Sequence, residues 1–340
     1  MSAGTEKTAT TELGKGGPRV GVQGLGCMGI SEFYGDTDEA AARDTLEAAL
    51  EAGVTLFDTA DIYGSGANET FLAPFVAAHR DEITLATKFG IVRSEEDPGY
   101  RGIGNDPAYI RQAVEASLRR LGTDVIDLYY MHRRDPLVPL AESVGAMAEL
   151  VRQGKVRQLG LSEVTGAELR EAHAVHPIAA LQSEWSLFSR DVERSAASAA
   201  AELGVTVVPY SPLGRGFLTG AFADASKDLG PGDFRVHQPR FTGENARTNA
   251  ALLEPVHTVA AAHGASAAQV ALAWVHQRAQ VHGLSVVPIP GTRKRGRLLE
   301  NVAAARLTLS AAELELLEPI AGQVAGDRYP DMSSTATARE

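Results

Sequence analysis

Short runs of apolar and β-branched residues alternate along the chain with longer segments whose apolar residues recur at helical spacing. The short runs predict eight buried strands, at residues 20–25, 54–57, 83–86, 125–130, 156–161, 178–181, 205–209 and 284–287. The longer segments predict helices at residues 38–52, 68–79, 106–121, 140–153, 165–174, 192–203, 249–263, 266–279, 295–304 and 311–321. Strands that alternate with helices in this way are typical of βα units around a parallel sheet.

Eight strands, each followed by at least one helix, predict a single (β/α)8 barrel, which needs about 250 residues. Two long Gly-rich loops, at residues 89–105 and 213–248, are expected at the C-terminal face, where loops of this length serve as binding segments or lids. The expected organisation is a flexible N-terminal tail over residues 1–18, the barrel over 19–327 and a C-terminal tail over 328–340.

The composition is that of an ordinary globular protein, with 44% hydrophobic and 22% charged residues in 340. The net charge of −11 argues against a protein that wraps nucleic acid or lies on an anionic membrane. Cys27 is the only cysteine, so the chain has no internal disulfide and no cysteine-rich metal site, and we expect no bound metal. A polar N-terminus and the lack of long apolar stretches favour a cytoplasmic protein.

Residues 24–29 match the G-x-G-x-x-G pattern of dinucleotide-binding sites. That pattern needs a helix to begin at its last glycine, so that the helix N-terminus meets the pyrophosphate. Here the next predicted helix begins only near Asp38, and the acid at the end of the second strand, Asp58, lies much further on than about 20 residues. The glycines therefore indicate a tight turn at the barrel mouth rather than a Rossmann fold.

Four side chains with acid–base chemistry follow the ends of successive predicted strands. Asp58 ends the second strand, with Tyr63 five residues later, Lys88 ends the third strand and His132 ends the fourth. Each has an ordinary explanation when taken alone. Asp58 could cap a turn, Tyr63 could pack in a loop, Lys88 could be a solvated strand end, and His132 could hydrogen-bond to a backbone carbonyl. Because catalytic groups of a (β/α)8 barrel come from the C-terminal ends of several strands, their joint placement predicts an active site.

These residues and seven further motifs resemble the aldo-keto reductases, most closely the branch that includes pyridoxal and perakine reductases. The motifs lie at residues 25–29 (LGCMG), 132–136 (HRRDP), 154–157 (GKVR), 160–163 (GLSE), 181–185 (LQSEW), 210–218 (YSPLGRGFL) and 290–292 (PGT). The resemblance covers residues 20–330. It implies a reductase that uses NADPH/NADP+ to convert a small-molecule aldehyde or ketone to an alcohol.

The resemblance also assigns roles to the four strand-end residues. Tyr63 is expected to be the general acid that gives a proton to the carbonyl oxygen while hydride adds to the carbon. A phenol with an ordinary pKa of about 10 is a poor donor near neutrality, and a nearby ammonium lowers that pKa. Lys88 is expected to supply this charge, Asp58 to hold Lys88 in place, and His132 to direct the carbonyl oxygen.

Four basic residues within five positions, 293–297, begin a predicted helix in an otherwise acidic chain. A phosphate at that helix N-terminus would suit them, although a solvated basic face is the alternative. The resemblance places the adenosine 2′-phosphate here and so favours NADPH over NADH. It implies cofactor contacts for Gly291, Thr292, Arg293 and Arg297 near the phosphate, Glu300 and Asn301 at the adenine, Ser162 and Gln182 at the carboxamide, Tyr210 stacked on the nicotinamide, and Ser211, Leu213 and Gly216 at the pyrophosphate.

Some features leave alternatives open. Glu163 stands where some branches of the family have an asparagine that shares the carboxamide, and Trp185 could line the substrate pocket or pack in the core. Phe33, Tyr34, the two long loops and the tail after Gly326 would shape a substrate site whose substrate the sequence does not identify. A cofactor-binding regulatory or sensor subunit, as the related potassium-channel β subunits are, is an alternative function, and a barrel lyase or isomerase is another. Assembly into a homo-oligomer is also left open.

Overall fold

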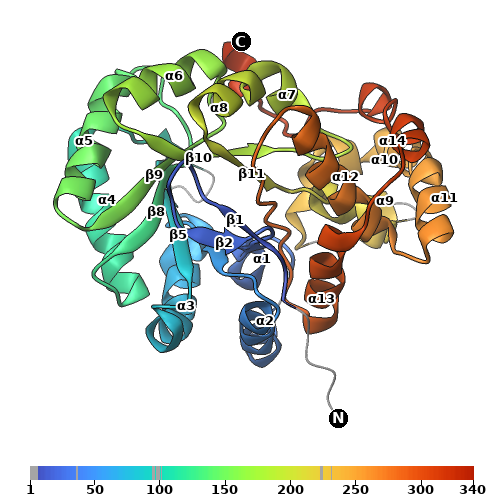
Figure 1. Cartoon of the computed structure of the whole chain (residues 1–340), viewed down its shortest axis with the longest axis horizontal. Coiled ribbons are helices and arrows are strands. Elements are labelled where there is room, and N and C mark those ends of the chain that lie inside the picture. The colour runs from blue at the N-terminus through green and yellow to red at the C-terminus, as the bar shows by residue number, and fades with distance from the viewer. Residues whose placement is uncertain are drawn as a thin grey trace.

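The computed structural model describes residues 7–35, 37–93, 96, 100, 102–222, 225–230 and 232–340. Within these ranges, seven parallel strands curl into a barrel-shaped sheet (Figure 1). In sheet order they are β3 (Leu25–Gly26), β4 (Leu56–Asp58), β5 (Thr84–Phe89), β8 (Ile126–Met131), β9 (Val156–Ser162), β10 (Ile178–Glu184) and β11 (Thr206–Tyr210). Strands that are neighbours in the sheet follow one another along the chain, as βα units require. The predicted (β/α)8 class is confirmed.

The eighth side of the barrel is an extended segment at residues 284–291 rather than a regular strand. Val286 forms a parallel bridge with Val207 of β11, and Gly291 forms one with Gly26 of β3. Pro288, in the middle of the segment, has no N–H to donate to a ladder, so the pairing is interrupted. The strand predicted at residues 284–287 is therefore in the expected place but makes only isolated bridges.

The Gly-rich segment 24–29 allows the barrel to close against residues 284–291. A Cβ atom on Gly26 would lie 2.8 Å from the carbonyl oxygen of Ile289, so only glycine allows the two backbones to approach. The helix that follows, α1 (Met28–Ser31), has only four residues, and α2 begins at Glu39. The glycines are thus not followed by the helix that a dinucleotide fingerprint needs.

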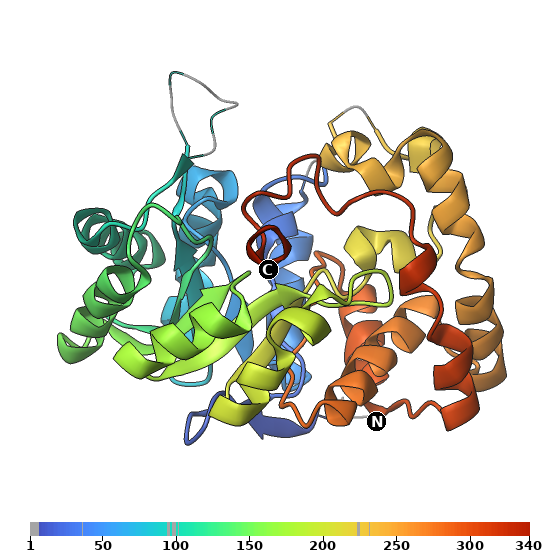
Figure 2. The same ribbon diagram turned by 90° about the horizontal axis from the view of Figure 1, so that it is seen from above.

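Helices cover the outside of the barrel, as Figures 1 and 2 show. They are α2 (Glu39–Glu51), α3 (Ala67–His79), α4 (Pro107–Leu121), α5 (Leu140–Arg152), α6 (Gly166–Val175), α8 (Ala197–Leu203), α12 (Ala267–Val281) and α13 (Arg295–Ala303). The sequence marks several of their starts. Asp106 accepts hydrogen bonds from two N–H groups of the first turn of α4, and Thr165 and Ser266 form capping boxes at α6 and α12.

Three predicted helices are shorter or broken. The helix predicted at residues 192–203 is divided at Ala196 into α7 (Asp191–Ser195) and α8, because Ala196 has a non-helical φ of −140°. The helix predicted at 249–263 is α11 (Glu254–His263), which begins beside Pro255 and is separate from α10 (Gly243–Ala251). The last predicted helix ends early, as α14 (Ala311–Leu317).

The N-terminal segment is ordered where a flexible tail was expected. Strands β1 (Thr10–Glu12) and β2 (Arg19–Gly21) form an antiparallel hairpin. Leu13 and Val20 are fully buried and pack with Leu56, Leu128 and Val208 of the barrel strands in the interior of the barrel. These two apolar side chains explain why the tail prediction fails from residue 10 onward, while residues 1–6 lie outside the described residues.

The segments at the barrel mouth contain more structure than the predicted loops implied. The first loop includes the short pair β6 (Ile91–Val92) and β7 (Gly102–Ile103). The second includes the turns η2 (Gly214–Thr219), η3 (Phe234–His237) and η4 (Pro239–Phe241) and the short α9 (Ala225–Asp228). Parts of both predicted loops, residues 94–95, 97–99, 101, 223–224 and 231, lie outside the described residues.

The C-terminal segment also differs from a tail. After η6 (Ala321–Gln323) the chain turns back across the barrel mouth and ends in η7 (Ala336–Arg339), close to the middle of the view in Figure 2. Arg328, Thr335 and Ala336 are buried there. Residues 328–340 are thus packed on the barrel, with consequences for the site described below.

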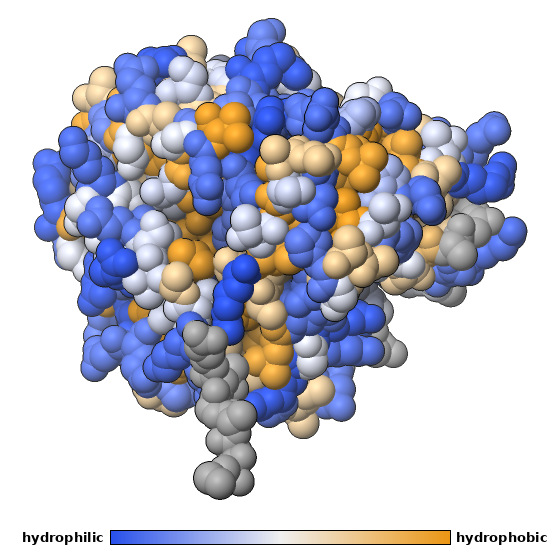
Figure 3. All heavy atoms as spheres, turned by 45° about the vertical axis from the view of Figure 1, so that its right-hand side comes forward, coloured by the Kyte–Doolittle hydropathy of each residue, from blue (hydrophilic) through white to orange (hydrophobic). Residues whose placement is uncertain are grey.

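The surface carries no broad apolar face in the view of Figure 3, where orange patches are small and interrupted by hydrophilic residues. Large apolar side chains that are exposed, such as Leu137 and Val281, are scattered singly, which is normal for a globular protein. In the described part of the chain, no helix is both long enough and apolar enough to cross a membrane.

Candidate active site

The barrel brings the four strand-end residues predicted to be catalytic to one place. Asp58 is the last residue of β4, Lys88 is the second-last residue of β5, and His132 follows β8 directly. Tyr63 begins the turn η1 (Tyr63–Gly66), which leads from β4 into α3. All four side chains are buried, with Lys88 completely inaccessible to solvent.

Lys88 is the centre of the group. Its Nζ lies 2.5 Å from Oδ1 of Asp58, 2.8 Å from the carbonyl oxygen of Thr59 and 3.3 Å from the hydroxyl of Tyr63. The other carboxylate oxygen of Asp58 accepts a hydrogen bond of 2.8 Å from Nε2 of Gln182. Lys88 thus has three oxygen partners, and the carboxylate that faces it is held from two sides.

The pKa values of the amine and the phenol fix their protonation states. Burial alone would lower the pKa of Lys88, but the charges of Asp58 and Tyr63 outweigh it and raise that pKa, so Lys88 stays an ammonium. Burial raises the pKa of Tyr63 above its ordinary value, and the opposing effect of Lys88 is smaller. The expected acidification of Tyr63 is therefore not present in this structure, and the phenol keeps its proton through neutral pH.

His132 is a neutral imidazole with an unused nitrogen. Its ring stands edge-on to that of Tyr63, with 6.0 Å between the ring centroids. Burial, with the charges of Arg133 and Lys88, lowers its pKa well below the ordinary value. Its Nδ1 is buried and has no hydrogen-bond partner among the described residues, which suits a site that awaits a polar ligand atom.

The residues expected to hold the nicotinamide lie at the ends of β9, β10 and β11, but they already have partners. Ser162 Oγ accepts a hydrogen bond of 3.3 Å from Arg133, and Gln182 is bonded to Asp58 as described above. The guanidinium carbon of Arg133 lies 6.0 Å from the centroid of the Tyr210 ring. Ser162 and Gln182 are thus hydrogen-bonded within the protein, and Tyr210 has a cation near its ring.

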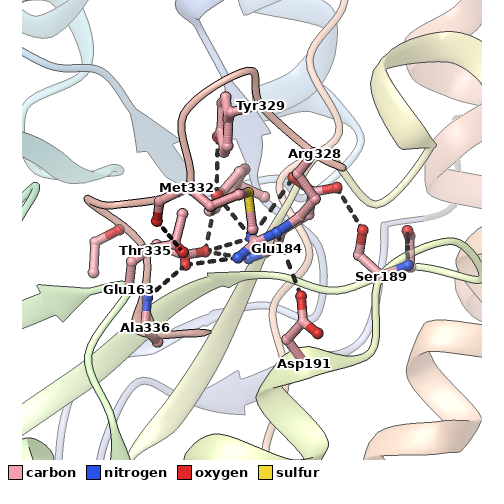
Figure 4. Close-up of polar contacts among 12 residues, drawn as sticks. Glu163, Glu184, Ser189, Asp191, Arg328, Tyr329, Met332, Thr335 and Ala336 are labelled. Carbon is pink, nitrogen blue, oxygen red and sulfur yellow. Dashed lines mark hydrogen bonds and ion pairs between the residues drawn. The ribbon is translucent and has the colours of Figure 1, made fainter. Parts of the chain in front are cut away.

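Glu163 is the residue at this end of the site that sequence reasoning set aside. Its carboxylate accepts a hydrogen bond from the Tyr210 hydroxyl (2.9 Å). It also accepts hydrogen bonds from both terminal nitrogens of Arg328 (2.9 and 3.0 Å) and from the backbone N–H of Ala336 (3.3 Å), as Figure 4 shows. Its backbone φ of 52° is unusual for a residue other than glycine. The sequence showed that a glutamate stands where related branches have an asparagine. It did not show that this glutamate pairs with an arginine near the C-terminus.

The loop expected at the pyrophosphate has a strongly curved backbone. Ser211, Gly214, Arg215 and Gly216 all have positive φ angles, of 47°, 54°, 58° and 91°. Leu213 begins the η2 turn, and its carbonyl accepts a hydrogen bond from the N–H of Gly216. Successive residues of this kind can form concave backbone surfaces that favour anions. In this loop the N–H groups of Gly214 and Gly216 donate to the carbonyl oxygens of Ser211 and Leu213.

The basic segment lies at the start of α13, where the resemblance implies the 2′-phosphate. Arg295 is paired with Asp44 and Glu51 of α2, whereas Lys294 and Arg297 are exposed and form no ion pair within the described ranges. Two cations without ion-pair partners at a helix N-terminus form a favourable binding site for a phosphate. Thr292 lies two residues before Lys294, and Gly291 contributes to barrel closure. Glu300 and Asn301 lie further along the same helix.

Arg293, which the resemblance places near the phosphate, has hydrogen-bond partners within the protein. Its guanidinium donates hydrogen bonds to the carbonyl oxygens of Tyr34 (2.6 Å) and Gly35 (3.0 Å) and to Oγ1 of Thr37 (2.8 Å). These contacts tie the segment before α2 to the segment before α13. Arg293 is therefore committed to holding a loop at the barrel mouth.

The aromatic residues suggested for the substrate pocket lie in two places, some at the barrel mouth and one in the hydrophobic core. Trp185 is fully buried, and its Nε1 donates a hydrogen bond of 3.0 Å to Glu193 of α7, so it packs in the core. Phe33 packs against Tyr63 and its neighbours, and both Phe33 and Tyr34 contact the ring of Phe234 edge-on. Phe33 and Tyr34 thus remain candidates for the substrate end of the site.

A parallel barrel whose strand ends gather buried ionisable side chains is the arrangement of a barrel enzyme. The chain belongs to the aldo/keto reductase family, because the sequence profile of that family matches residues 24–321. Members of this family are oxidoreductases that typically use NAD(P)H with small-molecule carbonyl compounds. The branch within the family is not established by this match.

Solved structures agree with this assignment. The chain is 28% identical to the glycerol dehydrogenase AKR11B4 from Gluconobacter oxydans, with a TM-score of 0.79 and coverage of 97% of this chain and 99% of that chain. It is 25% identical to the holo form of the aldo-keto reductase AKR11C1 from Bacillus halodurans, with a TM-score of 0.72 and coverage of 95% and 100%. It is 28% identical to the thermostable aldo-keto reductase Tm1743, solved with the inhibitor epalrestat, with a TM-score of 0.70 and coverage of 92% and 100%.

Proposed function

We propose that this chain is an NADPH-dependent reductase that converts a small-molecule aldehyde or ketone to an alcohol, with Tyr63 as the proton donor. The observation that carries the proposal is the position of Lys88 Nζ, which contacts both Asp58 (2.5 Å) and Tyr63 (3.3 Å) inside the barrel mouth. The motifs at residues 132–136 and 210–218 support a place in the branch of pyridoxal and perakine reductases. When bound, NADPH supplies the hydride that the carbonyl carbon receives.

Tyr63 is suited to give its proton to the carbonyl oxygen. The phenol is fully protonated at neutral pH, and an alkoxide that forms on the substrate is far more basic than a phenolate, so the proton moves in the favourable direction. The ammonium of Lys88 then stabilises the phenolate that remains. Asp58 keeps Lys88 charged and fixed, which is the reason for a buried acid beside a buried amine.

His132 would orient the substrate rather than donate the proton. Because its pKa is held well below the ordinary value, it is neutral during the reaction. A neutral imidazole in this position would offer one hydrogen bond to the substrate oxygen. A carbonyl oxygen placed between His132 and Tyr63 would have its proton donor within reach.

The remaining polar groups would hold the cofactor along the mouth. Tyr210 provides a ring for the nicotinamide face, with Ser162 and Gln182 beside it for the carboxamide. The curved loop with Ser211, Leu213 and Gly216 suits the pyrophosphate. Thr292 and Arg297, near Glu300 and Asn301, would hold the adenosine end, and the free cations there favour NADPH over NADH.

A screen of NADPH consumption against chemically diverse aldehydes and ketones tests the proposal, with Tyr63→Phe as the control variant. We expect turnover with at least one class of carbonyl, and a rate in the variant that is lower by a factor of about 10² to 10⁴, the usual contribution of general acid catalysis. NADPH binding without turnover of any carbonyl would instead indicate a cofactor-sensing subunit. Failure to bind NADPH would favour a lyase or isomerase.

A further inference from the structure

The last thirteen residues, 328–340, cross the barrel mouth at the ends of β9, β10 and β11, and we call them the C-terminal strap. The strap follows η6, turns over the mouth and ends in η7 (Ala336–Arg339) (Figure 2). Within the strap, Arg328, Thr335 and Ala336 are buried, while residues 329–334 are partly buried or exposed. The strap therefore touches the barrel at particular points rather than along its whole length.

The main attachment point is the ion pair of Glu163 and Arg328. Two parallel hydrogen bonds of 2.9 and 3.0 Å join their side chains, each of which is only 2% exposed (Figure 4). Burial would raise the pKa of Glu163, but Arg328 lowers it to about 2, so the carboxylate is charged over the whole range of ordinary pH. Ala336 and Arg339 donate further hydrogen bonds to the carboxylate and the carbonyl of Glu163, so both ends of the strap meet at one residue.

The strap contacts Tyr210, the residue whose ring the proposed function assigns to the nicotinamide. The hydroxyl of Tyr329 lies 3.1 Å from that of Tyr210, and Arg328 Nη1 lies 3.4 Å from the same Tyr210 hydroxyl. The guanidinium of Arg215 lies 4.9 Å from the Tyr329 ring centroid and connects the strap to the pyrophosphate loop. These contacts reach the hydroxyl end of Tyr210, so the strap lies beside the ring on which the nicotinamide would stack.

The contacts that hold the strap are polar, and the space behind it is not filled. A cavity of about 440 Å³ lies between the strap and α7, lined by Arg328, Met332 and Thr337 on one side and by Ser189 and Arg240 on the other. In the strap, all of which the structure describes, Ala336 is the one fully buried apolar side chain. A segment held by polar contacts with little apolar burial opens more readily than the core it covers.

We propose that the C-terminal strap is a gate over the cofactor site, latched by Glu163 and Arg328, and that it leaves the barrel mouth each time the nicotinamide cofactor enters or departs. The proposal rests on the proposed function for the location of the nicotinamide. It also explains the glutamate at position 163, which serves as the anchor of the strap. Glu163 and Arg328 are thus positioning residues for cofactor exchange and have no part in the chemical step.

The gate can be tested through the kinetics of NADPH binding, measured by stopped-flow fluorescence without any carbonyl substrate. The variants are a chain that stops after Asp327, Glu163→Gln, and Arg328→Gln as a second way to break the latch. Arg170→Gln is the matched control, because it breaks a guanidinium–carboxylate pair with Glu202 on the exposed surface. We expect association and dissociation of NADPH to be at least tenfold faster in the truncated chain, faster in both latch variants, and unchanged in the control.

Hydrogen exchange gives a second readout that needs no cofactor. In the intact protein, the amide of Ala336 donates to Glu163 and is expected to exchange slowly. Glu163→Gln should raise exchange across residues 328–340 at least tenfold and leave β9 protected, which also shows that the variant is folded. Exchange in the strap that equals that of an unprotected peptide in the unmodified protein would overturn the latch.

The outcomes separate the gate from the proposed reductase activity. NADPH kinetics that depend on the strap, without turnover of any carbonyl, would support the gate and contradict the reductase. Rates that agree within twofold between the intact and truncated chains would overturn the gate, whether or not carbonyls are reduced. An intact and a truncated chain that both fail to bind NADPH would overturn both proposals.

Discussion

Lys88 is the residue whose surroundings explain most of the site. A completely buried ammonium is costly unless it is paired and hydrogen-bonded, and Lys88 has Asp58, Thr59 and Tyr63 within 3.3 Å. Gln182 completes the arrangement by holding the second oxygen of Asp58. A group this expensive to bury is better explained by a role in chemistry than by a contribution to stability.

The preference for NADPH over NADH is expected to depend on single residues at the start of α13. Arg297→Ala removes an exposed cation that has no ion-pair partner among the residues that the structure describes. It should weaken NADPH binding about 10- to 100-fold, the effect of losing a charge-assisted hydrogen bond to phosphate. Binding of NADH, which lacks that phosphate, should not change. Fluorescence titration with both cofactors measures the two dissociation constants.

Arg295→Ala is the matched control for this prediction. Arg295 lies two residues away but is paired with Asp44 and Glu51 of α2, so its loss should leave the ratio of the two dissociation constants unchanged. An Arg297→Ala variant whose affinity for NADPH stays within twofold of the native value would contradict the assignment of the phosphate to this helix.

The N-terminal hairpin β1–β2 is an element that belongs to the barrel. Leu13→Ala should lower the free energy of unfolding by about 2–5 kcal/mol, because Leu13 is fully buried in the interior of the barrel. Urea denaturation measures this change. Leu137→Ala is the same substitution at a side chain that is 89% exposed, and it should have almost no effect. Equal small losses in both variants would show that the hairpin packs loosely.

The elements of the barrel could be predicted from the sequence because their signals are local. Apolar runs mark the strands, and residues such as Asp106 and Ser266 mark helix starts through their own side chains. The convergence of Asp58 and Lys88 with their neighbours then follows from the rule that parallel strands end on one face. The geometry of the four predicted catalytic residues agrees with that reasoning, while their roles stay predictions.

The elements that were not predicted depend on contacts between distant parts of the chain. The hairpin is ordered because Leu13 and Val20 find a barrel interior formed by residues far along the sequence. The strap is ordered because Arg328 meets Glu163, 165 positions away. Arg293 could be recognised as a cation from the sequence, but only the fold shows that backbone carbonyls before α2 use its guanidinium.

At the scale of the whole molecule, buried histidines make stability depend on pH. Burial lowers the pKa of His276 in α12 to about 4, and burial with neighbouring cations lowers that of His132 as well. In the unfolded chain both have ordinary values near 6.5. Above pH 6.5 neither state binds these protons. As the pH falls from 6.5 towards 4, the unfolded chain takes up protons that the folded chain refuses, so stability falls.

His276→Gln should therefore reduce the acid sensitivity of the fold. Each such histidine contributes at most about 1.4 kcal/mol of lost stability per pH unit in this window. Urea denaturation of the native chain and the variant at several pH values between 7 and 4.5 gives the two slopes. Parallel slopes would show that His276 is protonated as readily in the folded protein as in the unfolded chain.

The whole account depends on a proton that passes from Tyr63, beside Lys88, to a substrate oxygen at the mouth of the barrel. The most direct test is a single-turnover measurement with NADPH already bound, in which a reducible carbonyl is mixed with the native enzyme or with Tyr63→Phe and NADPH oxidation is followed. We predict that the variant binds NADPH with native affinity and oxidises it about 10² to 10⁴ times more slowly. Oxidation within threefold of the native rate would contradict the assignment of Tyr63 as the proton donor.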